Sequence, residues 1–473
     1  MQQRARTLAD QAFSRVAGAP LVDGNRVRLL KDAAENYPAW LEAIAAARRY
    51  VYFESYIIRE DAIGERFAEA LIAAAERGVR VRVIYDWLGG FGKTSRAFWS
   101  RLRAGGVEVR CYNPPRFDSP LGWLSRDHRK MVSVDGEVGF VTGLCVGQMW
   151  AGDPGKNIEP WRDTGVEIRG PAVADVERAF IDMWRGLGEP VPEEERWSTH
   201  EPFEPGETSV RIVAGEPASG GLFRVDQLVA ALARKRLWLT DAYYAGTTAY
   251  VKGLKAAAKS GVDVRLLVPG GSDIPIVQLV SRAGYRPLLE AGVRVFEWNG
   301  TMLHAKTAVA DGRWARVGST NLNLASWLGN CELDAVIEDE AFALQMEEMY
   351  RADLDNATEI VLDERHKLRA PHRSRHPVLT SGGGSGGRAA AGAVRIGNTL
   401  GAAFTNRRVL EPVEARTMMI GGGGLLVLAV LFAFFPAILA YPLVAIFVWV
   451  ALALLYRGYK LHRTGKQLHR PHE

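Results

Sequence analysis

The chain has 473 residues, 48% of them hydrophobic and 24% charged, which is enough for two sizeable domains and additional segments. The formal net charge of +5 is unevenly distributed: residues 366–473 carry 14 Lys and Arg against 3 Asp and Glu, whereas the rest of the chain carries 45 against 51. A nuclease would need its basic surface around the catalytic cleft, so this distribution argues against a nucleic-acid partner.

The chain begins with a basic segment, followed by alternating strand and helix patterns. Residues 1–20 predict a weakly amphipathic basic helix that either packs on the body or touches a bilayer, and they do not resemble a signal peptide. After this segment, strands such as "RRYVYFESY" (48–56) alternate with alanine-rich runs such as "LIAAAERGV" (71–79). This βα order predicts a sheet covered by helices.

The segment "DHRKMVSVDGEVGFVTGLC" (127–145) combines a strand pattern with ionisable residues. On a strand, residues i and i+2 face the same side, so His128 and Lys130 are expected to lie side by side. Asp135 and Gly136, between two apolar runs, predict a hairpin turn. An imidazole beside a fixed cation indicates a phosphate site that contains a titratable group.

The stretch "NPPRFDSPLGWLSRD" (113–127) leads into this first motif and contains about ten residues that have no counterpart in the second half of the chain, an insertion in the first half. It brings four large apolar residues close to His128 in sequence: Phe117, Leu121, Trp123 and Leu124. Such side chains at the mouth of a site could receive acyl chains, or they could cover the core of their own domain. The sequence leaves both interpretations open.

The first motif has a second copy, "LHAKTAVADGRWARVGSTN" (303–321), with His304, Lys306 and Asp311 at the same spacing. The repeat extends further, since "KRLWLTDAY" (235–243) echoes the earlier strand. The chain is therefore predicted to hold two homologous α/β lobes, related by a pseudo-twofold axis. This symmetry would bring the two histidines face to face across one phosphate.

These paired H-x-K-x4-D motifs resemble those of the phospholipase D superfamily, whose members carry them on two α/β/α lobes. From Val22 to Asp363 the chain looks like the bacterial cardiolipin synthases, with "PWRDTGVEIRGPAV" (160–173) as a telling match outside the motifs. The resemblance implies that one histidine attacks phosphorus and the other protonates the leaving alcohol, a division of labour that suits an imidazole. It implies no metal and no cofactor.

The resemblance also assigns roles to individual residues. The motif residues that it implies for catalysis are His128, Lys130, Asp135, His304, Lys306 and Asp311. Residues expected to contact the substrate phosphate are Gly143, Ser319 and Asn321, the last two in the second half-site, and those expected to orient the histidines are Glu332 and Asp163. Within the motifs, the two aspartates suit a turn or supporting role better than acid–base catalysis.

The first motif departs from the family pattern. Where relatives have Gly-Gly-x-Asn, this chain has Thr142, Gly143, Leu144 and Cys145, so an amide donor is replaced by a weakly bonding thiol. The asymmetry indicates either distinct roles for the two histidines or a weakened first half-site. Which histidine is the nucleophile does not follow from the sequence. With Cys111 and Cys331 elsewhere, the cysteines form no CxxC pair, which indicates a reduced compartment without a zinc site.

The last hundred residues predict a membrane anchor. Residues 366–416 are a Gly/Ser/Arg-rich linker, and Met418 to Tyr456 is an uncharged run. As one helix that run would measure about 58 Å, against about 30 Å of hydrocarbon, so residues 417–457 are predicted to form a transmembrane helical hairpin folded near Pro436. With basic residues on both sides and a basic tail at 458–473, both ends are expected to be cytoplasmic.

The sequence thus defines domains and a function to be tested. The expected domains are a basic helix (1–20), two phospholipase D-like lobes (21–200 and 201–365), the linker, the hairpin and the tail. We expect a phosphatidyltransferase of the cardiolipin synthase type at the bacterial inner membrane, with cytoplasmic lobes, an anionic membrane as partner and phosphatidylglycerol as substrate. Alternatives are a hydrolytic phospholipase D, a nuclease or an inactive membrane scaffold. The oligomeric state is not indicated.

Overall fold

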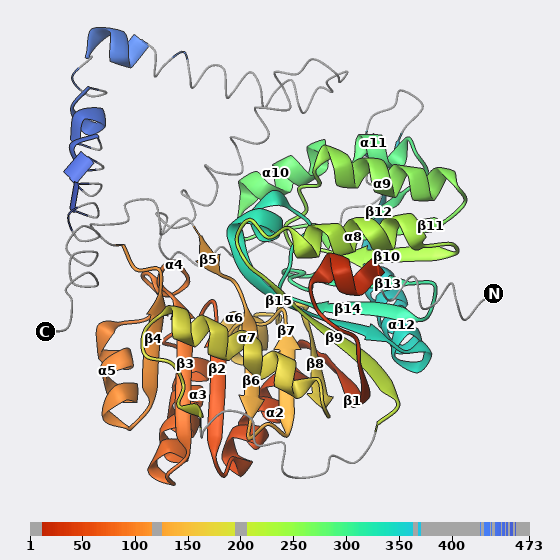
Figure 1. The fold of residues 1–473 in the computed structure, drawn as a ribbon. Helices are drawn as coiled ribbons and strands as arrows, with labels where there is room; N and C mark the ends of the chain where they lie inside the picture. The colour runs from red at the N-terminus through yellow and green to blue at the C-terminus, as the bar shows by residue number, and fades with distance from the viewer. Residues whose placement is uncertain are drawn as a thin grey trace, which may run out of the picture. The chain divides into compact units, whose positions relative to one another are not determined.

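Two mixed β-sheets, one from each half of the chain, dominate the computed structural model (Figure 1). The residues it describes are 12–115, 125–193, 206–362 and 368–369, with single positions and short runs between 426 and 459. Within these ranges the α/β architecture expected from the alternating strand and helix patterns is present in both halves.

The first sheet is built from residues of lobe 1 and has the strand order β1-β8-β7-β6-β2-β3-β4. Its strands are β1 (Val22–Lys31), β2 (Tyr50–Ser55), β3 (Arg80–Asp86), β4 (Glu108–Tyr112), β6 (Lys130–Val134), β7 (Val138–Thr142) and β8 (Thr164–Arg169). Strands β2, β3 and β4 are parallel, and the remaining pairs are antiparallel.

The second sheet has the order β9-β15-β14-β13-β10-β11-β12-β16. Its strands are β9 (Thr208–Gly215), β10 (Arg236–Thr240), β11 (Asp263–Pro269), β12 (Arg294–Trp298), β13 (Thr307–Ala310), β14 (Trp314–Gly318), β15 (Asn330–Glu338) and β16 (Ala357–Leu362). Except for the added β16, the order and directions repeat those of the first sheet. The predicted duplication of the fold is therefore confirmed.

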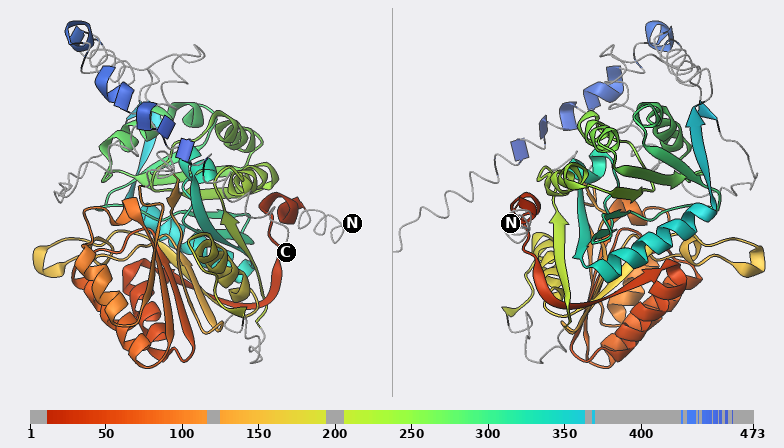
Figure 2. Two further views of the ribbon diagram at one scale, coloured as in Figure 1. Left: turned by 60° about the vertical axis from the view of Figure 1, so that its left-hand side comes forward. Right: turned by 90° about the vertical axis from the view of Figure 1, so that its right-hand side faces the viewer.

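Helices cover both sheets (Figure 2). In lobe 1 they are α2 (Asp32–Ala46), α3 (Ala62–Glu76), α5 (Arg96–Ala104) and α7 (Val173–Gly186), with the short α4 (Trp87–Gly90) and α6 (Gln148–Ala151). In lobe 2 they are α8 (Gly221–Leu232), α9 (Thr248–Lys259), α10 (Pro275–Ala283), α11 (Arg286–Leu289) and α12 (Glu340–Asp355). Several begin at a side-chain cap; the Asp61 carboxylate, for example, accepts the amides of Ile63 and Gly64 at the start of α3.

The two lobes share a hydrophobic core. Phe180 of α7 and Met346 of α12 belong to one buried cluster, together with Ile168 from the first sheet and Ala335 from the second. A second cluster consists mainly of lobe 1 residues but includes Tyr243 and Met302 of lobe 2, and a third consists mainly of lobe 2 residues. Because apolar side chains from both halves are buried together, the lobes are held as one unit, and this fixes the parts of the site that each lobe supplies.

Two segments beside the lobes bear on the sequence predictions. Residues 12–17 are helical and pack on lobe 2, where the Phe13 and Trp314 rings lie 6.4 Å apart and Arg211 donates to Ser14 and Ala19. Of the two alternatives expected for the basic helix, residues 12–17 therefore adopt the first: they pack on the protein itself. Leu368–Arg369, which we assigned to the linker, form strand β17 against β16 instead.

The predicted hairpin is described only in part, and the apolar residues of the insertion lie outside the described residues. Phe117, Leu121, Trp123 and Leu124 are outside them, as are 20 of the 41 residues in 417–457. Short helical runs are described at 430–434 and 440–445. In the part of the chain that the structure describes, none of the helices has both the length and the apolar character required to span a bilayer.

Candidate active site

The two histidines are held in equivalent places where the lobes meet. The short strand β5 (Arg126–Asp127) pairs with the start of β15, and the backbone amide of His128 donates to Cys331 O at 2.8 Å. On the other side, the amide of His304 donates to Arg162 O at 2.7 Å. The main chain of the opposite lobe therefore holds each histidine. In both cases the accepting carbonyl belongs to the residue just before a predicted orienting acid.

The histidine–acid pairs are formed crosswise between the lobes. His128 Nδ1 lies 2.8 Å from Glu332 Oε2, and His304 Nδ1 lies 2.6 Å from Asp163 Oδ2. Lobe 1 thus supplies the histidine of one half-site and the acid of the other. We use "His128 half-site" for His128, Lys130 and Glu332, and "His304 half-site" for His304, Lys306 and Asp163.

Both lysines turn back toward their histidines. Lys130 Nζ donates to His128 O, and Lys306 Nζ donates to His304 O and lies 2.9 Å from His304 Nδ1. Each ammonium group also lies over a tyrosine ring, at 5.3 Å from the Tyr56 centroid for Lys130 and at 5.9 Å from the Tyr243 centroid for Lys306. Both lysines are 1% exposed, so their charges act in a medium of low dielectric constant.

The electrostatic state of the histidines follows from this burial. Burial, with Lys130 as a further unfavourable charge, lowers the pKa of His128 to about 4, although Glu332 opposes the shift. Burial and the neighbouring Lys306 lower the pKa of His304 to about 3, against the effect of Asp163. Both imidazoles are therefore neutral at pH 7 in the protein without substrate.

The other groups of the site respond to the same fields. Burial lowers the pKa of Lys306 to about 8. Burial alone would raise the pKa of Asp163 and of Glu332, but each is lowered below its ordinary value by its histidine partner and a nearby lysine. The two carboxylates therefore stay ionised and accept the Nδ1–H of the neutral rings, which leaves each Nε2 with a free lone pair.

The two half-sites lie within electrostatic reach of each other. Lys306 of one half-site contributes to the lowered pKa of His128, and Lys130 contributes to that of His304. Cys145 lies near both lysines, which lower its pKa while burial raises it more strongly. The motif residues of the two lobes thus converge on one region, as the predicted pseudo-twofold relation requires.

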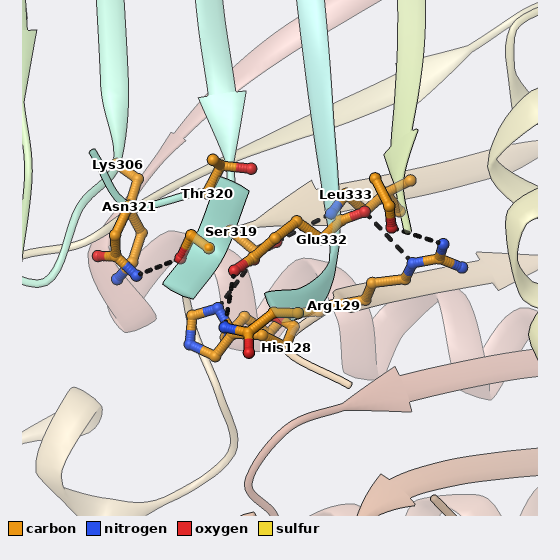
Figure 3. Close-up of polar contacts among 12 residues, drawn as sticks. His128, Arg129, Lys306, Ser319, Thr320, Asn321, Glu332 and Leu333 are labelled. Atoms are coloured by element: carbon orange, nitrogen blue, oxygen red, sulfur yellow. Dashed lines mark hydrogen bonds and ion pairs between the residues drawn. The ribbon is translucent and has the colours of Figure 1, made fainter. Parts of the chain in front are cut away.

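The residues predicted to bind phosphate have different surroundings (Figure 3). Ser319 Oγ donates to Glu332 Oε2 at 2.6 Å and accepts the Leu333 amide at 2.9 Å. Its hydroxyl therefore supports the acid of the His128 half-site, although the sequence assigned Ser319 to the second half-site; its contact with the substrate phosphate stays a prediction. Asn321 is 2% exposed; its Nδ2 donates weakly to Ser326 at 3.4 Å, and its Oδ1 has no partner among the described residues.

Gly143 occupies the position in lobe 1 that Ser319 has in lobe 2. A Cβ at Gly143 would lie 2.2 Å from Asp163 Oδ1, so glycine is required for the acid to approach. Its absent side chain makes room for the acid of the His304 half-site, and its amide donates to Thr164 O at 3.0 Å. The predicted contact of Gly143 with phosphate stays a prediction. The next turn of chain ends at Cys145, which is 1% exposed.

Asp135 and Asp311, grouped with the catalytic residues by their motifs, lie elsewhere. The Asp135 carboxylate accepts the backbone amides of Arg48, Arg49 and Tyr50, at the end of β6 remote from Lys130. Asp311 accepts the three equivalent amides, those of Arg234, Lys235 and Arg236. Both adopt the left-handed conformation that the hairpin turn needs, with φ of 56° and 53°. These contacts fit the turn or supporting role that the sequence favoured for both aspartates, since each anchors the start of a neighbouring strand.

Several residues around the histidines were missed by sequence reasoning. The Trp150 indole donates to Asp163 Oδ2 at 3.1 Å, and its ring lies 5.5 Å from that of His304. Tyr56 lies 5.0 Å from His128, and Tyr243 lies 5.8 Å from His304. The two tyrosines end the repeated segments 48–56 and 235–243, so the repeat contained a signal for them; we find no such signal for Trp150.

The residues of the site form no metal-binding cluster in the structure. Within the described ranges, no three His, Cys, Asp or Glu side chains are grouped as a cation would need. Each carboxylate of the site is instead paired with one imidazole. The chemistry that this arrangement supports is nucleophilic attack by one ring nitrogen with proton transfer by the other.

Comparisons with known proteins agree with this geometry. The family model described as "Cardiolipin synthase, PLD-like domain" matches residues 40–149 and 229–354, which contain both motifs. Cardiolipin synthase A of Pseudomonas aeruginosa is 34% identical over 76% of this chain and 73% of that protein. The cardiolipin synthase of Alkalihalophilus pseudofirmus is 31% identical over 72% of this chain and 68% of that protein.

A solved structure shares the fold at low sequence identity. The phosphatidylserine synthase of Haemophilus influenzae aligns with 74% of this chain and 91% of its own chain, with a TM-score of 0.60 and 16% identity. This likeness supports the assignment of the two-lobe architecture.

Proposed function

The chain belongs to the cardiolipin synthase family of phospholipase D-like proteins, and from this premise we propose that it transfers a phosphatidyl group from one phospholipid to the hydroxyl group of another. Phosphatidylglycerol is the proposed substrate and cardiolipin the proposed product. The observation that carries the proposed chemistry at phosphorus is the pair of crosswise histidine–acid contacts, His128 with Glu332 and His304 with Asp163.

The proposed reaction has two displacements at phosphorus. In the first, Nε2 of one histidine attacks the phosphodiester, the bond from phosphorus to the leaving alcohol breaks, and the second imidazole gives that oxygen a proton. In the second, the now neutral imidazole takes the proton of the incoming hydroxyl, whose oxygen attacks phosphorus; the bond from phosphorus to Nε2 breaks and the first histidine is released. Lys130 and Lys306 would hold the non-bridging oxygens as negative charge builds up on them.

The low pKa values of both imidazoles fit this scheme only if substrate changes them. Burial is the main cause of the lowered pKa of both histidines, and the lysines add to it. A phosphodiester carries one negative charge, so its binding between the two lysines would offset their part and favour the protonated imidazole. One ring could then bind the proton needed by the leaving alcohol. The acid–base pair is thus proposed to form together with the substrate complex.

Hydrolysis is the second candidate function, with water in the place of the accepting lipid. The same residues serve both reactions, so the relatives rather than the geometry favour transfer. An assay with phosphatidylglycerol vesicles separates them: transfer releases glycerol and forms cardiolipin, whereas hydrolysis forms phosphatidic acid. Phosphatidic acid as the main product would overturn the proposed transfer.

We further propose that residues 417–457 anchor the enzyme to the anionic cytoplasmic leaflet of the bacterial inner membrane. The uncharged run and its basic flanks support this proposal. Truncation after Thr380 should leave a core that acts on detergent-dispersed lipid but no longer sediments with membranes. A truncated protein that still fractionates with membranes would contradict the proposed anchor.

A further inference from the structure

Arg129 lies between the two motif residues His128 and Lys130 but serves neither directly. Successive side chains of an extended segment point in opposite directions, so its guanidinium points away from theirs. It is 3% exposed and donates to three carbonyl oxygens: Glu332 O at 3.3 Å, Ala179 O at 2.9 Å and Gly215 O at 3.2 Å. Figure 3 shows Arg129 beside Glu332. A buried cation thus binds the main chain of the acid that orients the adjacent histidine.

The partners of Arg129 are placed so that it fixes the position of Glu332. Gly215 and Glu332 are register partners on β9 and β15, so the guanidinium holds both strands at the residue from which the carboxylate projects. The amide of His128 donates to the preceding carbonyl, Cys331 O. Residues 128–129 are therefore joined to 331–332 by main-chain and side-chain contacts, of which the imidazole–carboxylate bond is only one.

In the His304 half-site a different arginine has the same relation to the acid. Arg162 Nη1 donates to the carbonyl oxygen of Asp163, and the guanidinium is held by Asp353 at 2.8 and 2.9 Å and by Asp32 at 3.1 Å. Arg162 is 4% exposed. Each orienting acid therefore has one buried arginine on its own carbonyl oxygen.

The two arginines occupy positions that the internal repeat does not relate. Arg129 aligns with Ala305 of the second motif, and Arg162 aligns with Cys331, the residue before Glu332. Burying a guanidinium is costly unless its donors are satisfied, so each arginine must be supported by its surroundings. The same contact thus arises from two unrelated sequence positions, which points to a requirement of the site rather than to inheritance from the duplicated fold.

We propose that Arg129 and Arg162 are positioning residues, each of which holds one acid in register with its histidine across the lobes. The arginine restricts the main chain, the carboxylate then keeps the Nδ1–H tautomer, and Nε2 stays available for phosphorus. The expected effect of replacing these arginines on turnover rests on the proposed function. Their expected effect on the histidine–acid hydrogen bond does not.

The test replaces each arginine by lysine, which keeps the charge but loses the planar fork of donors. In the full chain in detergent, labelled with ¹⁵N-histidine, the downfield Nδ1–H signal of His128 should shift or broaden in Arg129→Lys while that of His304 stays in place. Arg162→Lys should give the reverse. With phosphatidylglycerol as substrate, kcat should fall roughly 100-fold in each variant and KM should change little.

Arg211→Lys is the matched control, because Arg211 is 0% exposed and donates to Ser14 and Ala19, away from both acids. It should leave both imidazole signals and kcat unchanged. The proposal is overturned if a folded Arg129→Lys leaves the His128 signal in place, or if either variant moves both signals equally. Should lysine prevent folding, Arg129→Gln and Arg162→Gln, which keep a planar donor, are judged by the same signals. If the protein without substitutions shows no activity on phosphatidylglycerol, that result contradicts the proposed function but not the positioning role of the arginines.

Discussion

The His128 and His304 half-sites have the same residue types and bond pattern but different surroundings. The carboxylate of Glu332 is supported by a hydroxyl, that of Ser319, whereas Asp163 is supported by the indole of Trp150. Among the described residues, the ring of His128 has one aromatic neighbour, Tyr56, and the ring of His304 has three. Burial lowers the pKa of His304 to about 3 and that of His128 to about 4.

This comparison teaches that duplication preserved the positions of the reacting groups while residues outside the motifs differentiated them. Burial disfavours the imidazolium in both half-sites; after burial, the next largest influence is the unfavourable charge of Lys306 for His304 but the favourable charge of Glu332 for His128. Two identical motifs can therefore have different acid–base behaviour within one site. The following experiments test whether that difference matters for turnover.

The largest effect is expected from removing either imidazole. His128→Ala and His304→Ala should each lower turnover of phosphatidylglycerol by roughly 10⁴-fold or more, because the reaction needs a nucleophile and a proton donor at once. Mass spectrometry of the lipid products measures the loss, and thermal unfolding followed by circular dichroism verifies the fold. Substantial activity in either variant would break the equivalence of the half-sites and contradict a shared phosphate.

The acids come next. Glu332→Gln and Asp163→Asn keep the size of the side chain but remove the charge that stabilises the tautomer, so kcat should fall roughly 10²- to 10⁴-fold. The ratio of the two losses shows which half-site depends more on its acid. Asp135→Asn is the control: it should lower the melting temperature, because three backbone amides lose a charged acceptor, and leave kcat of the folded protein unchanged.

A smaller difference is expected between the two residues at the ends of the motif turns. Asn321→Ala should lower kcat/KM by roughly tenfold or more if its amide binds the charged phosphate. Cys145→Ala should lower it by less than about threefold, because a thiol is a weak donor. Steady-state assays on mixed micelles measure both. Equal losses of kcat/KM in the two variants would mean that the cysteine in lobe 1 contributes as much to catalysis as the asparagine in lobe 2.

The last prediction concerns the stability of the fold against pH and not turnover. Both histidines have a folded-state pKa below the ordinary 6.5, so between pH 6.5 and about 4 the unfolded chain binds their protons and the folded protein does not. Stability is present above pH 6.5 and should fall by about 1.4 kcal/mol per pH unit for each histidine as the pH drops. Urea unfolding at several pH values, compared with His128→Gln and His304→Gln, should show a shallower slope in each variant. Equal slopes would contradict the lowered pKa values.

The repeat and the motif spacing predicted much of the fold and of the site. The alternation of apolar residues is a local property, so the strands, the hairpin turns and the duplicated lobes could be predicted from neighbouring residues. The side-by-side placement of His128 and Lys130 follows from the same local rule. Glu332 and Asp163 were identified as orienting acids by the family resemblance.

Features that depend on how the lobes pack could not be predicted. The assignment of each acid to the histidine of the other lobe arises where β5 meets β15, a pairing between segments about 200 residues apart in the chain. The contact of the Ser319 hydroxyl with Glu332 could not be predicted either, because nothing local in the sequence shows it. The roles of Arg129 and Arg162 could not be predicted because neither arginine has a counterpart in the internal repeat.

The crosswise pairing makes the reacting groups a reporter of the contact between the halves. A small rotation of one lobe against the other would separate His128 from Glu332 and His304 from Asp163 simultaneously, although each sheet could remain intact. We therefore expect activity to be lost at a lower temperature or denaturant concentration than secondary structure. The hydrophobic cluster that contains Phe180 and Met346 would then set the temperature at which the enzyme works, far from any reacting atom.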